Sequence, residues 1–500
     1  MQKLVVVLAL AASAASAAPL SPDVEATLQH ISANSLRGHL SFIASDLLEG
    51  RGAPSRGLDL AAEYIAAQFR RAGLEPLGDD GYFQTANWTL AEPNLDGFAL
   101  NVGGIALTRE QVSFDIVPAV QGKDAGVVKA DYGNLAALEA LGAAVAGKVV
   151  VTEIVRKSVR SEAEYLAQVK ERDAFLARMA ALKPLLLLDV ERTHPAGNSG
   201  GKGRLVDPEN PPHDSGVARV TIHGADAVRW FDALPAGTGG TKVSVTLSAS
   251  RTRPAKLRNV AGVLRGSDPA LKDSYVMVTA HYDHLGMRAN GTGDTIYNGA
   301  NDDGSGTVSV IEIADALAAM KQRPKRSVVF MTVFGEELGL LGSRYYGRHP
   351  LVPVAKTVAD INLEQVGRTD SSEGEQRNNA SMTGFDFTDM GPIFAQAGEQ
   401  TGIKVSKHAV NSDAYFGLSD NQALADQGVP AHTLCVSFEY PDYHGVGDHW
   451  EKVDYDNMAK VDRMVALGVL TIANNAKAPA WNAANTLTAK YAAARKLQEK

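Results

Sequence analysis

The feature that most constrains the fold is a series of short, continuous apolar runs in the second half of the chain. These runs are Asn259–Leu264, Tyr275–Ala280, Ser327–Phe334, Val358–Leu363 and Ala431–Phe438. The segments between them carry apolar residues at helical spacing, as in the sets Val310, Ile313, Leu317 and Met320, and Val461, Val465, Gly468 and Ile472. Continuous apolar strands joined by helices are typical of a largely parallel sheet that helices cover on both faces. We therefore expect an α/β fold, in which helices sandwich a mixed sheet with a mostly parallel centre.

The first half of the chain differs in character, and 500 residues exceed what one hydrophobic core usually organises. Leu58, Ala62, Ile65 and Phe69 predict a helix that Gly73 would cap. From about residue 101, short β-like runs alternate with alanine-rich helical stretches: Lys148–Val155, Pro184–Val190, Ala218–His223 and Lys242–Leu247. Glycine, asparagine and proline between His194 and His213 predict an exposed loop. We divide the chain into residues 1–18, 19–100, 101–252, 253–478 and 479–500, with 101–252 as an inserted β-rich α+β lobe and 479–500 as a helical tail.

The first 18 residues have the pattern of a secretory signal peptide. Lys3 precedes the apolar run Leu4–Ala11, and small residues end at Ala17 and Ala18, where cleavage is expected. The stretch is too short to span a membrane comfortably, and no later stretch resembles a transmembrane helix. The net charge of −8 argues against non-specific binding to nucleic acid. We expect a secreted or periplasmic protein without a membrane span.

Cys435 is the only cysteine, so no disulfide can form within the chain. It lies inside an apolar run, which favours a buried strand thiol over a nucleophile.

Polar residues follow the ends of several apolar runs, where ligands gather in open α/β sheets. His281 closes the run Tyr275–Ala280, and Asp283 could accept the hydrogen bond of its second ring nitrogen. His284 is interpreted as a structural histidine. Asp302 lies in a glycine-rich stretch that leads into a helix, where acidic residues are ordinarily caps.

Two adjacent glutamates follow the run Ser327–Phe334. Glu336 and Glu337 point in different directions, so one can bind a metal while the other holds a water molecule as general base. Glu364 ends another apolar run, and His444 lies in a loop after the run that holds Cys435. Individually these signals are weak, but together they supply His281, Asp302, Glu337, Glu364 and His444 from the strand ends of one sheet.

Imidazole and carboxylate ligands without thiolate suit zinc, with manganese or cobalt as substitutes. One bridging carboxylate, with one histidine and one terminal carboxylate for each ion, leaves both ions an open position. Two ions about 3.5–4 Å apart can share a hydroxide whose pKa falls toward about 7. The sequence therefore predicts two Zn²⁺ ions per chain and hydrolysis at neutral pH.

With these residues identified, the chain resembles the M28 family of metallopeptidases, the co-catalytic zinc aminopeptidases. The resemblance covers most of the mature chain and is strongest in Ala280–Gly286, Asn301–Gly306, Phe334–Gly342, Asn362–Arg368 and Asp442–Asp448. The stretch Ser45–Arg51, followed by Gly57, also resembles bacterial members. The lobe from about 100 to 250 resembles a protease-associated (PA) domain. The resemblance implies the zinc exopeptidase fold.

The resemblance also implies a role for each site residue. Asp302 would bridge the two ions, His281 and Glu364 would complete one metal position, and Glu337 and His444 would complete the other. Glu336 would be the general base, Asp283 the hydrogen-bond partner of His281, and Tyr443 a donor to the oxyanion or a packed tyrosine. Two features depart from the family: Glu364 stands where many members have aspartate, and Ser419-Asp420-Asn421 stands where the family often has Ser-Asp-His.

The expected function is hydrolysis of the N-terminal bond of peptides that have a free N-terminus, with the metal-bridging hydroxide as nucleophile. A carboxypeptidase or dipeptidase on the same scaffold is an alternative, for which Arg344 or Arg368 could bind a C-terminal carboxylate. Cyclisation of N-terminal glutamine is disfavoured because relatives with that chemistry lack the histidine present here as His281. A non-catalytic binding protein ranks low because the chain keeps all five ligands and the base.

Overall fold

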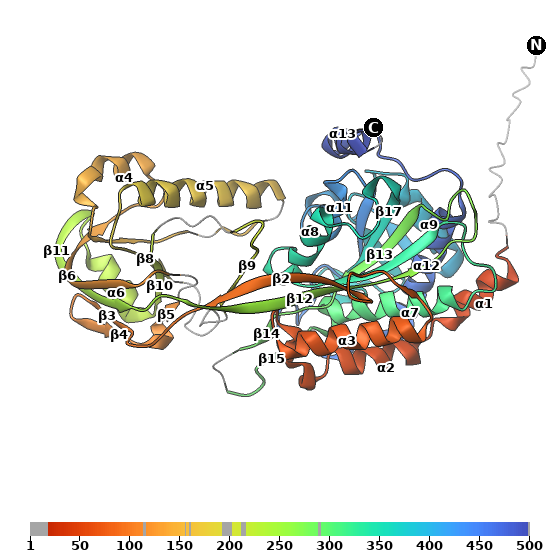
Figure 1. Cartoon of the computed structure of the whole chain (residues 1–500), viewed down its shortest axis with the longest axis horizontal. Coiled ribbons are helices and arrows are strands. Elements are labelled where there is room, and N and C mark those ends of the chain that lie inside the picture. The colour runs from red at the N-terminus through yellow and green to blue at the C-terminus, as the bar shows by residue number, and fades with distance from the viewer. Residues whose placement is uncertain are drawn as a thin grey trace, which may run out of the picture.

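The computed structural model describes residues 19–113, 117–155, 157–159, 162–192, 203–211, 217–288 and 292–498. These residues form two lobes that lie side by side, joined by the long strands β2 (Phe83–Glu92) and β12 (Arg251–Leu264) (Figure 1). The predicted signal peptide, residues 1–18, lies outside the described residues. In the described part of the chain, no helix has the length and apolar character needed to cross a bilayer.

The larger lobe is built on a mixed sheet of ten strands among the described residues. Its order is β21-β20-β22-β17-β13-β16-β12-β2-β9, and β1 pairs with β12 beside this path. The four central strands run parallel, whereas β12 is antiparallel to both β16 and β2. The remaining bounds are β1 Glu75–Pro76, β9 Arg204–Val206, β13 Tyr275–His281, β16 Ser327–Val333, β17 Thr357–Leu363, β20 Asn379–Met382, β21 Lys404–Ser406 and β22 Ala431–Cys435. The expected sheet with a parallel centre is confirmed.

Helices cover both faces of this sheet (Figure 1). One face carries the main core, formed with α1 (Pro22–His30), α2 (Ala33–Ile43), α3 (Arg56–Arg71), α7 (Gly306–Ala318), α9 (Met390–Thr401) and α12 (Tyr455–Asn474). The opposite face packs against α8 (Leu341–Arg348), α11 (Asn421–Ala425) and α13 (Ala489–Gln498). Short two-stranded ribbons, β14 (Gly286–Met287) with β15 (Ile296–Tyr297) and β18 (Asp370–Ser371) with β19 (Gly374–Glu375), and the short helix α10 (Asn411–Ala414) complete the lobe.

The helix α3 shows how local sequence sets these elements. The hydroxyl of Ser55 accepts the N–H of Leu58 and so caps the first turn. Gly73 follows the last turn with a φ of +78°, which fits the predicted glycine cap. Leu58, Ala62, Ile65 and Phe69, the predicted apolar stripe, are all at most 2% exposed.

The smaller lobe holds an eight-stranded sheet within the described residues, in the order β4-β3-β11-β6-β7-β8-β10-β5. Its strands are β3 (Ala99–Val102), β4 (Ile105–Leu107), β5 (Val112–Ser113), β6 (Val120–Lys129), β7 (Val149–Thr152), β8 (Leu186–Glu191), β10 (Arg219–His223) and β11 (Gly237–Leu247). Its helices are α4 (Leu135–Leu141), α5 (Glu162–Ala181) and α6 (Ala225–Ala233). The lobe has its own two cores, one on each face of the sheet. Its likeness to a PA domain stays a prediction.

One prediction about this lobe is partly wrong. The glycine-rich segment between His194 and His213 was expected to be an exposed loop, but its residues Arg204–Val206 form β9 and pair antiparallel with β2. Asp207, just after this strand, is only 8% exposed and pairs with Arg348 of α8 at 2.5 Å. The segment therefore returns from the smaller lobe to the edge of the larger sheet.

Candidate metal centre

His281 is the last residue of β13, and its side chain is fully buried. Its Nε2 lies 3.3 Å from Asp302 Oδ1, and its Nδ1 lies 3.5 Å from Asp283 Oδ1 and 3.2 Å from the Asp283 carbonyl oxygen. Asp283 Oδ1 in turn accepts the backbone N–H of Glu336 at 3.1 Å. Burial disfavours the charged imidazole, but the nearby carboxylates of Asp283 and Asp302 raise the pKa of His281 well above its ordinary value. Asp283 thus lies where it orients this ring, as the sequence predicts.

Asp302 lies at the centre of the cluster, in the turn Ala300–Ser305 that leads into α7. Its Oδ1 faces His281, and its Oδ2 lies 3.1 Å from His444 Nε2. Burial opposes its ionisation, but these two histidines hold the pKa of Asp302 below its usual range. Asp448 fixes the turn, because its Oδ2 accepts the N–H groups of Asn301 and Asp302 at 2.9 and 3.2 Å. The two oxygens of Asp302 therefore face two different groups of donors.

Glu336 and Glu337 follow β16 in a tight turn that begins at Gly335, whose φ is +70°. Glu337 Oε2 lies 3.4 Å from His444 Nε2, on the Oδ2 side of Asp302. Glu336 Oε2 lies 4.0 Å from His281 Nε2. Burial raises the pKa of Glu336 well above its usual value, and the carboxylates of Glu364 and Glu337 add to this effect. The two glutamates diverge as expected.

Glu364 follows β17 and joins His281 and Asp302 in a group whose donor atoms all lie within 4.8 Å of one another. Burial raises the pKa of Glu364 to about 7, with the Asp302 carboxylate contributing. His444 reaches the cluster from the loop after β22, with a φ of +52° and a side chain that is 41% exposed. Its ring stacks on Tyr443 at a centroid distance of 4.1 Å. All five predicted ligands therefore meet at one edge of the sheet.

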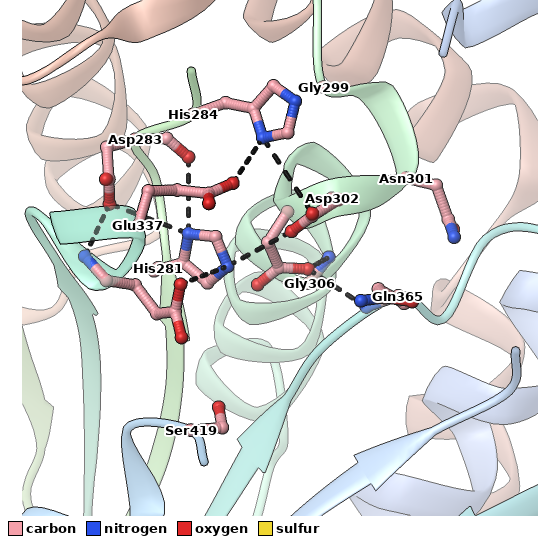
Figure 2. A network of polar contacts seen from close by, with 12 residues as sticks. His281, Asp283, His284, Gly299, Asn301, Asp302, Gly306, Glu337, Gln365 and Ser419 are labelled. Atoms are coloured by element: carbon pink, nitrogen blue, oxygen red, sulfur yellow. Dashed lines mark hydrogen bonds and ion pairs between the residues drawn. The ribbon is translucent and has the colours of Figure 1, made fainter. Parts of the chain in front are cut away.

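His284 was interpreted as structural, but the structure brings it to the same centre. Its side chain is fully buried, and its Nδ1 lies 2.7 Å from Glu337 Oε1 and 3.9 Å from Asp302 Oδ2 (Figure 2). His284, Asp302 and Glu337 form a second group of three donors within 4.8 Å of one another. The ring can pack here because Gly299 has no side chain: a Cβ at that position would lie 2.4 Å from His284 Cγ. The sequence offered one sign of this position, the histidine itself, because His284 meets Glu337 and Asp302 only through the folding of distant segments.

Arg51 is a second residue whose role the sequence did not reveal. It is 0% exposed and donates to the carbonyl oxygens of Ile43, Tyr282, Asn298 and Gly299 at 2.6–2.8 Å. Burial lowers the pKa of Arg51 to about 10, with Asp283 and Asp448 opposing this effect, so it stays charged at neutral pH. The guanidinium thus ties together the two loops that carry the donors His281 and Asp302. The stretch Ser45–Arg51, noted for its resemblance, supplies this residue.

The donor atoms fit a cation. In the described part of the chain, His281 Nε2, Glu337 Oε1 and His284 Nδ1 are buried and face one another or Asp302, but none of them makes a well-aligned hydrogen bond. Such atoms are costly to bury unpartnered, and a bound metal ion would satisfy them. Histidine nitrogens and carboxylate oxygens, without thiolate, are the ligands of catalytic zinc sites. Cys435 is buried in β22, as expected of a strand thiol, and burial raises its pKa well above the usual value.

Comparisons with known proteins agree with this arrangement. The model of peptidase family M28 matches residues 259–469. A probable zinc metalloprotease of Pyricularia oryzae is 27% identical over 326 residues, which cover 55% of this chain and 62% of that protein. A probable glutamate carboxypeptidase of Zea mays is 31% identical over 144 residues, which cover 27% of this chain and 18% of that protein. The chain therefore spans less than two thirds of the length of these relatives.

Solved structures extend the likeness to the whole fold. The aminopeptidase of Aneurinibacillus sp. strain AM-1 superposes with a TM-score of 0.63 at 18% identity, over 91% of this chain and 97% of that one. At this identity the match shows the fold, including both lobes, and not the activity. The segment that matches the family model contains His281, Asp302, Glu336, Glu337, Glu364 and His444. Residues 259–469, which hold the whole candidate metal centre, are therefore similar to peptidase family M28, and the longer of the two curated matches is to a probable zinc metalloprotease.

Proposed function

We propose that the protein is a di-zinc aminopeptidase that hydrolyses the N-terminal bond of peptides. The observation that carries this proposal is the position of the Asp302 carboxylate between two groups of donors. Its Oδ1 faces His281, whose group includes Glu364, and its Oδ2 faces His444 and lies on the side of Glu337. A carboxylate shared in this way is the arrangement that holds two metal ions close together.

Bound zinc would polarise the scissile carbonyl and lower the pKa of the attacking water. Glu336 would take the proton of that water and pass it to the leaving amine. The Asp283 contact with its backbone N–H fixes the position of Glu336. Tyr443 lines the cavity beside His444, where its hydroxyl could donate to the oxyanion.

The cavity offers carboxylates that could receive a free N-terminus. A cavity of ≈ 930 Å³ opens over the metal centre, and its lining includes six carboxylate residues: Asp302, Glu336, Glu337, Glu364, Asp426 and Glu439. The zinc ions would neutralise four of these, Asp302, Glu336, Glu337 and Glu364. Asp426 and Glu439 could attract a substrate ammonium group, although Arg344 and Arg348 also line the cavity. We infer that the substrates are peptides with a free N-terminus and that residues 1–18 direct the protein to the periplasm or the exterior.

A carboxypeptidase is the second candidate, and one observation favours it. Arg344 is exposed and lines the cavity, where it could bind a C-terminal carboxylate. Arg368, the other candidate, is 3% exposed and paired with Asp370 at 2.5 Å and Asp442 at 3.0 Å, which occupies its guanidinium. The maize relative named for carboxypeptidase activity is consistent with this alternative.

The experiment compares aminoacyl p-nitroanilides with the same compounds carrying an N-acetyl cap. We expect hydrolysis of the free amines only, loss of hydrolysis on chelation, and recovery with zinc. Glu336→Gln should keep the metal content but lose about 10²–10⁴-fold in kcat, as expected for a general base. Cleavage of capped peptides that have a free C-terminus, lost in Arg344→Gln, would instead establish the carboxypeptidase.

A further inference from the structure

The cavity over the metal centre has a wall that the larger lobe does not supply. Its floor contains the candidate ligands, including Asp302 and Glu337, whereas Val159, Tyr165 and Leu166 of the smaller lobe line another part of it. Tyr165 and Leu166 belong to the first turns of α5, which extends from the smaller lobe toward the larger one (Figure 1). Both lobes therefore contribute to one cavity.

Several exposed apolar side chains line this cavity. Five of the thirteen large hydrophobic residues that are exposed in the described chain line it: Val159, Tyr165, Leu166, Leu338 and Tyr443. Their exposed fractions range from 36% to 53%. Single exposed apolar residues are normal, but several that line one cavity beside polar groups indicate a binding surface.

The packing of α5 also indicates that its first half contributes to a binding surface. Phe175 and Met179, in its second half, are at most 1% exposed and pack in the core of the smaller lobe. Its side chains from residue 164 to 174 are exposed or half-buried, so this half of the helix projects beyond that core. Packing within the lobe does not explain Tyr165 (47% exposed) or Leu166 (53% exposed).

The candidate metal centre on the floor and apolar groups on the wall suit a peptide with an apolar side chain near the scissile bond. Leu338 lies directly after Glu336 and Glu337, so the wall begins beside the reacting bond. We propose that Val159, Tyr165 and Leu166, together with Leu338, form a specificity wall that selects peptides with an apolar side chain next to the scissile bond. This inference rests on the proposed peptidase function and adds its substrate class.

The test uses the full-length enzyme with zinc and four peptide amides: Leu-Leu-Gly, Leu-Ser-Gly, Ser-Leu-Gly and Ser-Ser-Gly. Wild type should cleave Leu-Leu-Gly about tenfold or more faster in kcat/KM than Ser-Ser-Gly, the ratio expected when an apolar pocket loses a few methylene groups. The double variant Tyr165→Ser/Leu166→Ser should lose most of this preference while changing the rate on Ser-Ser-Gly less than about twofold. The two single-leucine peptides identify which side of the bond contacts the wall.

Val410→Ser is the matched control, because Val410 is 71% exposed and does not line the cavity. It should leave all four rates unchanged, and both variants should keep the melting temperature and zinc content of wild type. The proposed specificity wall is refuted if wild type shows no preference for the leucine peptides, or if the double variant keeps that preference. Failure of wild type to cleave any of the four peptides overturns the proposed aminopeptidase function itself, and the wall with it.

Discussion

Replacing Arg51 should loosen the metal centre from a distance. Its guanidinium makes four hydrogen bonds to buried carbonyl oxygens, on segments that include Tyr282 and Gly299. Methionine fills much the same volume but donates nothing, so Arg51→Met removes all four hydrogen bonds, although the Gly299 carbonyl keeps the N–H of Gly304 as a donor at 3.0 Å. A hydrogen bond to a charged group is worth about 1.5–3 kcal/mol, so four of them total roughly 6 kcal/mol or more.

Packing of the methionine side chain would recover a part of this, which leaves a net loss of about 4 kcal/mol. Because 1 kcal/mol shifts the melting temperature of a large domain by about 2–4 °C, we expect the variant to melt about 8 °C or more below wild type. Differential scanning calorimetry of chelator-treated protein at pH 7 measures the shift without the contribution of bound metal.

Arg253→Met is the control for this measurement. Arg253 lies on β12 with a side chain that is 54% exposed, and it forms an ion pair with Glu92 at 2.9 Å. Exposed pairs contribute little, so this variant should melt within about 2 °C of wild type. If Arg51→Met also melts within that interval, the four hydrogen bonds do not hold the loops together, and the reasoning is refuted.

Three further predictions concern burial, close packing and metal content. Burial raises the pKa of Asp360 to about 8, above its unfolded value of about 4, so the folded state holds an extra proton and loses stability as pH rises between these values. Relative to wild type, the free energy of unfolding of Asp360→Asn should therefore rise by about 2 kcal/mol between pH 6 and pH 8, as measured by urea unfolding. An equal dependence of this free energy on pH in the two proteins would contradict the prediction. A Cβ at Gly57 would lie 1.7 Å from a backbone oxygen, so Gly57→Ala should lower the melting temperature by several degrees, whereas Gly38→Ala, inside α2 with nothing within 4 Å, should raise it slightly. The double variant His284→Ala/His444→Ala should hold one zinc per chain by mass spectrometry after dialysis, because both histidines contact the same carboxylate pair; retention of two would contradict their role.

The sequence predicts those parts of the fold that local patterns encode. The central strands were predictable because a strand buried on both faces is a continuous apolar run, as Tyr275–His281 and Ser327–Val333 are. The candidate ligands were predictable because they follow such runs at the carboxyl ends of parallel strands. Sequence patterns therefore indicated both the sheet and the edge at which the donors meet.

Features that depend on contacts between distant segments were missed. Strand β9 has only three residues in a segment rich in turn-forming residues, and it is a strand only because β2 lies beside it. The burial of Arg51 and the approach of His284 to Glu337 likewise depend on how separate loops pack, which no local periodicity records. The sequence also gave no sign of a role for Tyr165 and Leu166 of α5, because these residues line a cavity rather than pack in a core.

The paired strands β2 and β12 have a consequence for engineering the molecule. The chain leaves the larger lobe along one strand and returns along its hydrogen-bonded neighbour, so that Glu92 and Arg251 face each other across the pair. A tight hairpin between these two residues could close the larger lobe in the same register, and a different domain could be grafted there. Such an excision would also remove β9 and Asp207, which would leave β2 as an open edge available to pair with other chains and Arg348 without its partner. A shortened enzyme would therefore need a charged residue or a proline on the exposed side of β2 to stay monomeric.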